Sequence, residues 1–288
     1  MPARGRRTAH DTPRRVHLPV TWREHHSRVS TPTVLPSPTT LEPPRSVNVI
    51  AHRGASAAAP ENTLASLAAA VVDGADLVEV DVQSTADGVL VLMHDTHLDR
   101  TTDAAARLGR RGLALGEVAY DDVARLDAGS WFASSFAGER VPRLADALHL
   151  LVASRTGLQL ELKHPELYPG VVDRLLIELA PVRGRIPLLV QSFHEPSLAE
   201  LREKAPWLEL GLLGRPHARR LPELGTWLQQ VNPHHRRIDR RYVEAVHAAG
   251  LRCTPWTVDS RAAMRRVLDL SVDGVITDHP RRLREHVV

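Results

Sequence analysis

The sequence has a single cysteine, few aromatic residues and no long apolar run. With only Cys253, the chain cannot build an internal disulfide framework, which fits a reducing compartment and predicts a cytoplasmic location. Aromatic residues make up 4% of the 288 residues, so aliphatic side chains must fill the core. No apolar run approaches the roughly 18 residues of a membrane-spanning helix, and we expect no membrane span. The N-terminus also lacks the apolar stretch and small-residue cleavage site of a secretory signal.

The basic character of the chain is concentrated at its N-terminus. Residues 1–46 hold eight arginines against three acidic residues, a net charge of +5, and eight of the 21 prolines. The remaining 242 residues carry 29 basic and 31 acidic side chains, a net charge of −2. This composition predicts a disordered tail over residues 1–46. Three interpretations of the tail stay open: an inert extension, which we favour, a contact with phosphate or nucleic acid, and a contact with an acidic membrane. Because the body is nearly neutral, we expect no nucleic-acid partner.

From residue 47 onward, short apolar segments alternate with helical patterns. Strands are predicted at residues 47–52, 77–85, 157–163, 187–193, 208–214, 230–234, 252–258 and 274–278. Helices are predicted at residues 63–72, 144–153, 171–179, 196–204, 240–249 and 260–268. Eight strands with intervening helices fit an α/β fold of the (β/α)8 TIM-barrel type better than a doubly wound sheet. We therefore predict one barrel domain over residues 47–288.

Two of the predicted strands carry acidic residues on one face. One strand alternates valines with Glu79 and Asp81, and another alternates leucines with Glu161 and Lys163. A strand buried on both faces would be almost entirely apolar, so we expect the polar faces to line the barrel mouth. Three carboxylates and one ammonium there would be costly unless a cation, a substrate or each other neutralised them. Barrels of this type carry their chemistry at the carboxyl ends of the strands.

The Asp87-Gly88 pair predicts a two-residue hairpin turn after the second strand. A turn centred there pairs Asp81 with His94, at the level of the acidic cluster. Residues 89–94 would then form a returning antiparallel arm rather than a barrel strand.

A long insertion is predicted after this arm, over residues 95–143. It contains Trp131, Phe132 and Phe136. Long inserts over a barrel mouth commonly form lids or substrate walls, and we expect that role here. On the seventh predicted strand, Trp256 is expected either to wall the substrate pocket or to fill the core.

His52 ends the first predicted strand and is followed by Arg53 and Gly54. Imidazole is well matched to proton transfer near neutral pH, and arginine binds a pair of phosphate oxygens bidentately. Glycine at position 54 would let the backbone approach a ligand closely. With His94, these residues indicate cleavage of a phosphate ester. In the following Pro-Glu-Asn-Thr segment, Asn62 or Thr63 is expected to be a helix N-cap.

The three carboxylates Glu79, Asp81 and Glu161 are the candidate metal ligands. They leave room for waters and phosphate oxygens, as Mg²⁺ or Ca²⁺ prefers. Zinc fits less well, because no histidine pair with zinc-like spacing accompanies them. The alternative is an interior ion-pair network with Lys163, which would otherwise neutralise phosphate charge.

The order of these motifs resembles the glycerophosphodiester phosphodiesterase family. The shared segments are His-Arg-Gly, Pro-Glu-Asn-Thr, Glu-x-Asp, the Asp-Gly turn, His-Asp, Glu-Leu-Lys, Trp-Thr-Val and Ile-Thr-Asp. The resemblance spans about residues 49–280 and implies a (β/α)8 barrel with a small insertion after the second strand. It also implies one divalent cation and hydrolysis of glycerophosphodiesters to glycerol 3-phosphate and an alcohol. Asp259 stands where the family commonly has asparagine, which we expect to change the polarity of the pocket.

Carried over by position, the resemblance implies roles for individual residues. His52 and His94 match the catalytic histidines, and Arg53 and Lys163 match the phosphate-binding residues. The metal ligands match Glu79, Asp81 and Glu161, and Trp256 is a candidate for substrate contact. Which histidine is the acid stays open, as do the head group, the metal and the oligomeric state.

Two rival functions remain open. One is a phospholipase D-type or lysophospholipase enzyme on the same fold that accepts a lipid tail. The other is a non-catalytic binding module, against which the complete set of histidines and carboxylates argues.

Overall fold

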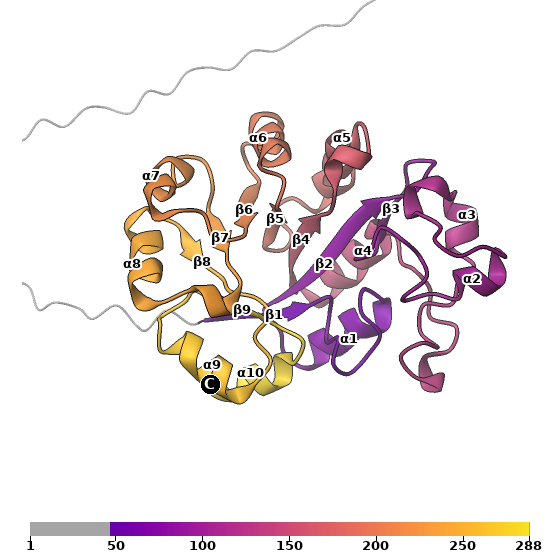
Figure 1. The fold of residues 1–288 in the computed structure, drawn as a ribbon, viewed down its shortest axis with the longest axis horizontal. Helices are drawn as coiled ribbons and strands as arrows, with labels where there is room; N and C mark the ends of the chain where they lie inside the picture. Colours follow the sequence, from indigo (N-terminus) through magenta and orange to yellow (C-terminus); the bar gives the residue numbers. More distant parts are fainter. Residues whose placement is uncertain (1–46, 288) are drawn as a thin grey trace, which may run out of the picture. The chain divides into compact units, whose positions relative to one another are not determined.

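Eight parallel strands form a nearly closed barrel within residues 47–287, the part of the chain that the computed structural model describes (Figure 1). In barrel order they are β1 (Asn48–His52), β2 (Leu77–Ser84), β4 (Gly157–Leu162), β5 (Leu188–Ser192), β6 (Glu209–Leu213), β7 (Gln230–Asn232), β8 (Arg252–Cys253) and β9 (Gly274–Thr277). The predicted TIM barrel is confirmed, and each predicted strand overlaps an observed one. The predicted tail, residues 1–46, lies outside the described residues.

The remaining gap in the barrel, between β8 and β9, is bridged by backbone hydrogen bonds around a proline. Asp273 N donates to Cys253 O and Ile276 N donates to Pro255 O, both at 3.0 Å. Because Pro255 has no N–H to donate, the ladder is interrupted there and β8 is only two residues long. The strand predicted over residues 252–258 was therefore too long.

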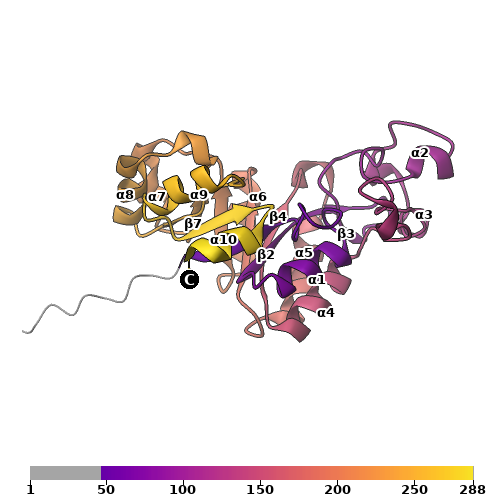
Figure 2. The same ribbon diagram turned by 90° about the horizontal axis from the view of Figure 1, so that it is seen from below.

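Helices cover the outside of the barrel (Figures 1 and 2). They are α1 (Leu64–Val72), α4 (Leu144–Ser154), α5 (Val171–Leu179), α6 (Glu195–Lys204), α7 (Leu221–Leu224), α8 (Arg240–Ala248), α9 (Arg261–Leu268) and α10 (Pro280–Val287). All six predicted helices are confirmed. The helix α10 was missed because its sequence is mostly charged and Leu283 is its one buried aliphatic side chain. Within residues 47–287, no helix has the length and apolarity that crossing a membrane requires.

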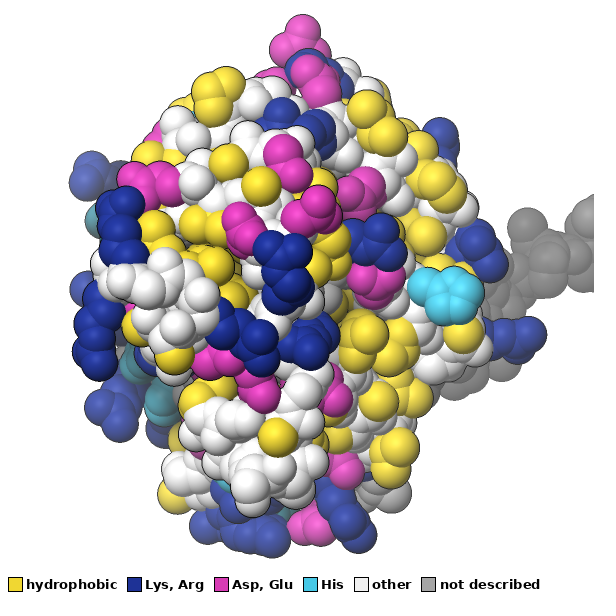
Figure 3. Space-filling view, turned by 90° about the vertical axis from the view of Figure 1, so that its right-hand side faces the viewer, with side chains coloured by type: hydrophobic (Ala, Val, Ile, Leu, Met, Phe, Trp, Pro, Cys, Tyr) yellow, Lys and Arg dark blue, Asp and Glu magenta, His cyan; other side chains and the backbone are white. Residues whose placement is uncertain are grey.

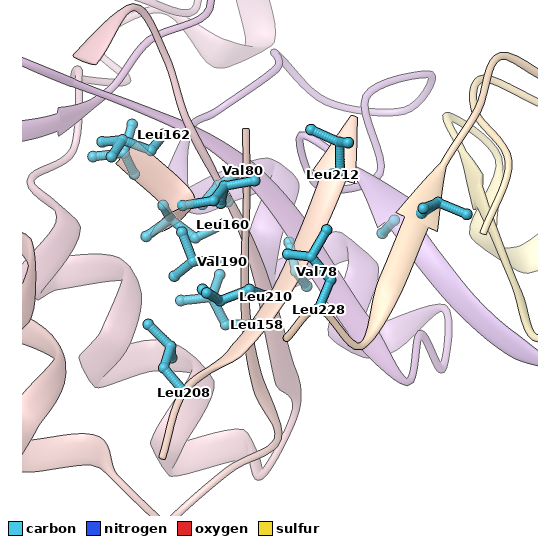
Figure 4. Close-up of a cluster of buried hydrophobic side chains, with 14 of the residues drawn as sticks. Val78, Val80, Leu158, Leu160, Leu162, Val190, Leu208, Leu210, Leu212 and Leu228 are labelled. Atoms are coloured by element: carbon cyan, nitrogen blue, oxygen red, sulfur yellow. The ribbon is translucent and has the colours of Figure 1, made fainter. Parts of the chain in front are cut away.

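The main core lies between the strands and these helices. On β2, Val78 and Val80 point outward, and on β4 the leucines Leu158, Leu160 and Leu162 do the same (Figure 4). All five side chains are at most 1% exposed. Burying each contributes roughly 1.5–3 kcal/mol, and this burial turns the other face of both strands into the barrel. The predicted alternation is confirmed.

The inner face below the mouth is a layer of hydrogen-bonded amides. Gln159 donates to Gln191 Oε1 at 2.8 Å, and Gln230 donates to Gln159 Oε1 at 3.2 Å. Asn232 also donates to Gln191. Because these buried polar groups satisfy one another, they form a fixed floor beneath the carboxyl ends of the strands.

The hairpin after β2 has a longer turn than expected. Its returning arm β3 (Leu90–Leu92) pairs antiparallel with β2, as predicted, and lies outside the barrel path. The loop has three residues and ends at Gly88, whose φ of +87° supplies the left-handed conformation that such a loop needs. The pairing therefore shifts by one residue, and Met93 N donates to Asp81 O at 2.9 Å. The predicted pairing of Asp81 with His94 was wrong.

The insertion after β3 has a small core of its own. It contains the short helices α2 (Ala104–Arg107) and α3 (Tyr120–Val123) and buries Leu98, Leu115 and Leu126. On the side of the molecule where β3, α2 and α3 lie, basic and acidic side chains are intermixed (Figure 3). Because side chains of opposite charge lie next to one another, this surface favours ion pairs.

Candidate active site

A cavity of about 90 Å³ lies at the carboxyl ends of the barrel strands. Its lining residues are His52, Arg53, Glu79, His94, Glu161, Lys163, Gln191, Phe193, Leu213, Trp256 and Ile276. Seven of the eight predicted site residues are in this lining. The eighth, Asp81, is 1% exposed and contacts two of them, Arg53 and Lys163. The barrel thus brings the whole predicted set together.

Three carboxylates meet beneath this cavity. Asp81 of β2 lies beside Glu161 of β4 in the sheet register, and Glu79 is two residues earlier on the same face. Each offers a ligand oxygen, and these oxygens lie within 4.8 Å of one another. Among the described residues, Asp81 Oδ1 has no hydrogen-bond partner although it is buried. Lys163 Nζ is 3.3 Å from this oxygen, and a cluster of three hard carboxylate donors fits a divalent cation such as Mg²⁺ or Ca²⁺.

The charges of these carboxylates are not fully balanced by the protein. Burial, with the nearby charge of Asp81, raises the pKa of Glu79 to about 7 and that of Glu161 to about 8. Burial acts in the same direction on Asp81, but Lys163 and Arg53 hold its pKa well below the ordinary value. A site that resists ionisation of two of its three carboxylates is one that a cation would stabilise.

The two basic residues of the site both contact Asp81. Lys163 Nζ is 3.3 Å from Asp81 Oδ1 and 3.0 Å from Glu161 Oε1. Arg53 Nε is 3.1 Å from Asp81 Oδ2, and Arg53 Nη1 donates to Glu61 Oε1 at 2.9 Å. The ion pairs of Lys163 that we weighed as an alternative are therefore present. They coexist with the carboxylate cluster rather than replacing it.

Each histidine of the site is held through Nδ1 by an aspartate. His52 Nδ1 donates to Asp278 Oδ1 and His94 Nδ1 donates to Asp95 Oδ1, both at 2.6 Å. Burial alone would lower the pKa of His52, but the bond to Asp278 and the charge of Glu79 raise it above the ordinary value. Burial lowers the pKa of His94, and the opposing charge of Asp81 does not compensate. The pKa of His52 is therefore raised and that of His94 is lowered. In each ring Nδ1 is bonded to an aspartate, so Nε2 is the nitrogen that can contact a substrate.

Asn62 has a larger role than the expected helix cap. Thr63 is the N-cap of α1, accepting from Ser66 N, whereas Asn62 donates to Asp81 Oδ2 at 2.9 Å and accepts from Asp81 N at 3.1 Å. Asn62 and Arg53 both have a φ of +56°. Such strained residues cluster at functional sites, where the surroundings hold them in place.

Gly54 lies tightly packed against the start of α1. A Cβ at this position would lie 2.5 Å from the carbonyl carbon of Ser66 in α1, and the φ of Gly54 is +81°. The glycine therefore lets the turn after β1 pack against α1. Close approach of a ligand to this backbone stays a prediction.

Gly54→Ala is expected to lower the free energy of unfolding by about 1–3 kcal/mol more than Gly109→Ala, because overpacking against backbone adds to the strain of positive φ. Gly109 is the matched control: its φ is +68° and no atom of the described residues lies within 4 Å of the Cβ position. Urea denaturation of both variants measures the difference. Equal losses would show that the contact with α1 is not limiting.

Several residues that the sequence interpretation missed support the site from outside the cavity. Asp278 and Asp95 hold the histidines, and Glu61 holds Arg53. Asp259, expected to change pocket polarity, accepts instead from Asp278 N at 2.9 Å. It is not in the lining of the catalytic cavity within residues 47–287, so that expectation was wrong.

Aromatic side chains wall one side of the cavity. Trp256 donates through Nε1 to Asn232 O at 2.7 Å and meets Phe193 edge to face at 6.0 Å between ring centroids. Its place in the lining favours the pocket-wall interpretation over core filling. The insertion's Trp131 and Phe132 pack against each other at 5.7 Å, and neither is among the described residues that line this cavity. These two aromatics therefore do not wall this cavity, and the expected role of the insertion as a lid or substrate wall stays a prediction.

Comparison with known proteins assigns the chain to a family. The profile of the glycerophosphoryl diester phosphodiesterase family matches residues 52–282. The chain belongs to this family. The glycerophosphodiester phosphodiesterase of Caldanaerobacter subterraneus is 34% identical over 238 residues, which cover 82% of this chain and 95% of that protein. The predicted family and enzyme class are confirmed.

Solved structures of two phosphodiesterases have a similar fold. An Oleispira antarctica phosphodiesterase in complex with the product sn-glycerol-3-phosphate has a TM-score of 0.76 and 31% identity, covering 83% of this chain and 96% of that one. The glycerophosphodiester phosphodiesterase of Agrobacterium tumefaciens has a TM-score of 0.70 and 31% identity, covering 83% and 99%. Both alignments cover more than four fifths of this chain.

Proposed function

We propose that this protein hydrolyses glycerophosphodiesters to sn-glycerol 3-phosphate and an alcohol, with one divalent cation. The observation that carries this proposal is the convergence of three carboxylates and two aspartate-held histidines on one cavity at the barrel mouth. The glycerol 3-phosphate complex of the Oleispira relative supports this product class.

We propose that Glu79, Asp81 and Glu161 hold Mg²⁺ or Ca²⁺. The all-oxygen donor set, whose ligand atoms lie within 4.8 Å of one another, supports this assignment. When bound, such a cation would stabilise the negative charge that develops on the phosphate oxygens. The protein's own cations complete the phosphate site, with Arg53 offering a planar fork of donors and Lys163 a point charge.

The opposite pKa shifts of His52 and His94 support one assignment of the general acid and the general base. His52, whose pKa is raised, keeps a proton near neutral pH and donates it to the departing alkoxide as general acid. His94, whose pKa is lowered, is neutral and accepts a proton from the attacking water as general base. Asp278 and Asp95 fix the Nδ1–H tautomers, so that Nε2 is the atom that gives or takes the proton in each case.

This assignment predicts a bell-shaped pH dependence of kcat/KM. Activity should fall at acid pH as His94 gains a proton below the ordinary histidine value of 6.5, and at alkaline pH as His52 loses its proton above it. Asp278→Asn removes the carboxylate charge that raises the pKa of His52, so the alkaline limb should move to lower pH while the acid limb stays. If Asp278→Asn shifted the acid limb instead, His52 would be the general base and His94 the general acid.

The dimensions of the site favour a small substrate. The 90 Å³ cavity suits a glycerol phosphate unit. A second hollow of about 300 Å³ shares Glu161, Lys163 and Phe193 with it, and provides room for the leaving alcohol. These volumes support a deacylated glycerophosphodiester over a lipid-tailed substrate.

A cytoplasmic location also stays a prediction, supported by the buried and unpaired Cys253.

The proposal is tested with the full-length chain on glycerophosphocholine and glycerophosphoethanolamine, in Mg²⁺ or Ca²⁺. We expect equimolar release of glycerol 3-phosphate and the free alcohol. Release of the free alcohol from lysophospholipids alone, with a lysophosphatidate as the other product, would instead establish the lipid-tailed alternative. No release from any of these diesters would contradict the proposed reaction.

A further inference from the structure

We propose that Arg100, contributed by the insertion, is a positioning residue of the catalytic site. Through Glu61 it fixes Arg53, and through Asp95 it fixes His94. This inference rests on the proposed function and extends it to a residue outside the catalytic cavity.

The first arm runs from Arg100 to the phosphate-binding arginine. Arg100 Nη1 donates to Glu61 Oε2 at 2.9 Å and Nη2 donates to Glu61 Oε1 at 2.7 Å, a bidentate pair. Glu61 Oε1 also accepts from Arg53 Nη1 at 2.9 Å. Glu61 is thereby held between two guanidinium groups, and the side chain of Arg53 is left with one orientation toward the cavity.

The second arm runs from Arg100 to the proposed general base. Arg100 Nε donates to Asp95 Oδ2 at 2.5 Å and Nη2 reaches Asp95 Oδ1 at 3.2 Å. Asp95 Oδ1 is also the acceptor of His94 Nδ1. Burial would raise the pKa of Asp95, but the bonds from Arg100 and His94 lower it to about 2. Asp95 therefore stays ionised and continues to orient the imidazole.

The geometry indicates positioning rather than a large contribution to stability. The Arg100 side chain is 43% exposed, and exposed ion pairs usually contribute less than about 1 kcal/mol. Its planar fork, however, binds two carboxylates at once, which the single ammonium of lysine does not reproduce. Arg107 of the same insertion is a matched control, since it is 50% exposed and pairs with Asp103 at 2.6 Å, outside the catalytic network.

The test compares Arg100→Ala, Arg100→Lys and Arg107→Ala for glycerol 3-phosphate release and, by calorimetry, for affinity to inorganic phosphate. Arg100→Ala is expected to lower kcat/KM by about 10–100-fold, the range found for residues that orient others at a site, with an unchanged melting temperature. Phosphate affinity should fall too, because Arg53 loses its support. Arg100→Lys should recover only part of both losses, and Arg107→Ala should behave as the parent protein.

A multiple-mutant cycle checks that Arg100 acts through its two partners. Adding Arg100→Ala to the Glu61→Ala/Asp95→Ala variant should produce little further loss, because that variant has already lost both side chains that Arg100 contacts. The inference would be overturned if Arg100→Ala lowered activity in that variant by the same factor as in the parent protein. It would also be overturned if Arg100→Ala alone left turnover and phosphate affinity unchanged. A parent protein that releases no glycerol 3-phosphate, yet loses phosphate affinity on Arg100→Ala, would refute the proposed function and leave the positioning role standing.

Discussion

Replacing His52 with alanine is expected to lower kcat by about 10²–10⁴-fold, the usual contribution of general acid–base catalysis. The alkoxide would then leave without a proton from the enzyme. His94→Ala should cause a loss of the same order, because the attacking water would lack its base. Steady-state release of glycerol 3-phosphate measures both losses.

Controls separate this chemistry from general damage to the site. His97 is an exposed histidine on the same segment as His94, and its alanine variant should keep the parent rate. Asp278→Asn retains the imidazole but weakens its orientation, so it should lose less than His52→Ala. A His52→Ala enzyme with nearly full turnover would remove this histidine from the mechanism.

Asp81→Asn is expected to abolish most metal-dependent activity, by about 10³-fold or more. A bound cation contributes several kcal/mol to transition-state stabilisation, and each 1.36 kcal/mol corresponds to a factor of ten. The amide keeps the size of the side chain but removes the charge between Glu79 and Glu161. The same substitution should also lower the stability of the metal-free protein, because Lys163 and Arg53 would lose the buried charge with which both are paired.

Thermal unfolding with EDTA and with added cation distinguishes the two effects. The parent should gain melting temperature when the cation is added, whereas Asp81→Asn should gain little. Asp121→Asn, an exposed position on α3, is the control for a change of surface charge. An Asp81→Asn variant that keeps both its activity and its metal-induced stabilisation would exclude Asp81 as a ligand.

The barrel could be predicted because strand polarity is visible in local alternation. The valines of β2 and leucines of β4 determine which face packs on the helices, and Glu79, Asp81 and Glu161 are thereby turned inward. The candidate site followed from the same alternation and from the position of His52 at the end of β1. Both depend on spacing within one element, which a sequence displays directly.

The remaining features depend on conformation or on contacts between distant segments. The register of the hairpin depends on whether its loop has two or three residues, which Asp87-Gly88 alone does not decide. Asp278 is 226 residues from His52, and no local pattern pairs them. Asp95, by contrast, directly follows His94, and an acid next to a catalytic histidine was a signal that could have been used.

The most direct test of the account is the rate of glycerol 3-phosphate release as a function of free Mg²⁺ or Ca²⁺, after chelation, for the parent and for Glu161→Gln. The account predicts a parent rate that rises from near zero to a plateau, and a variant that needs much more cation or shows no rise. Full parent activity in EDTA, or an unchanged cation dependence in Glu161→Gln, would contradict metal-dependent hydrolysis at this carboxylate cluster.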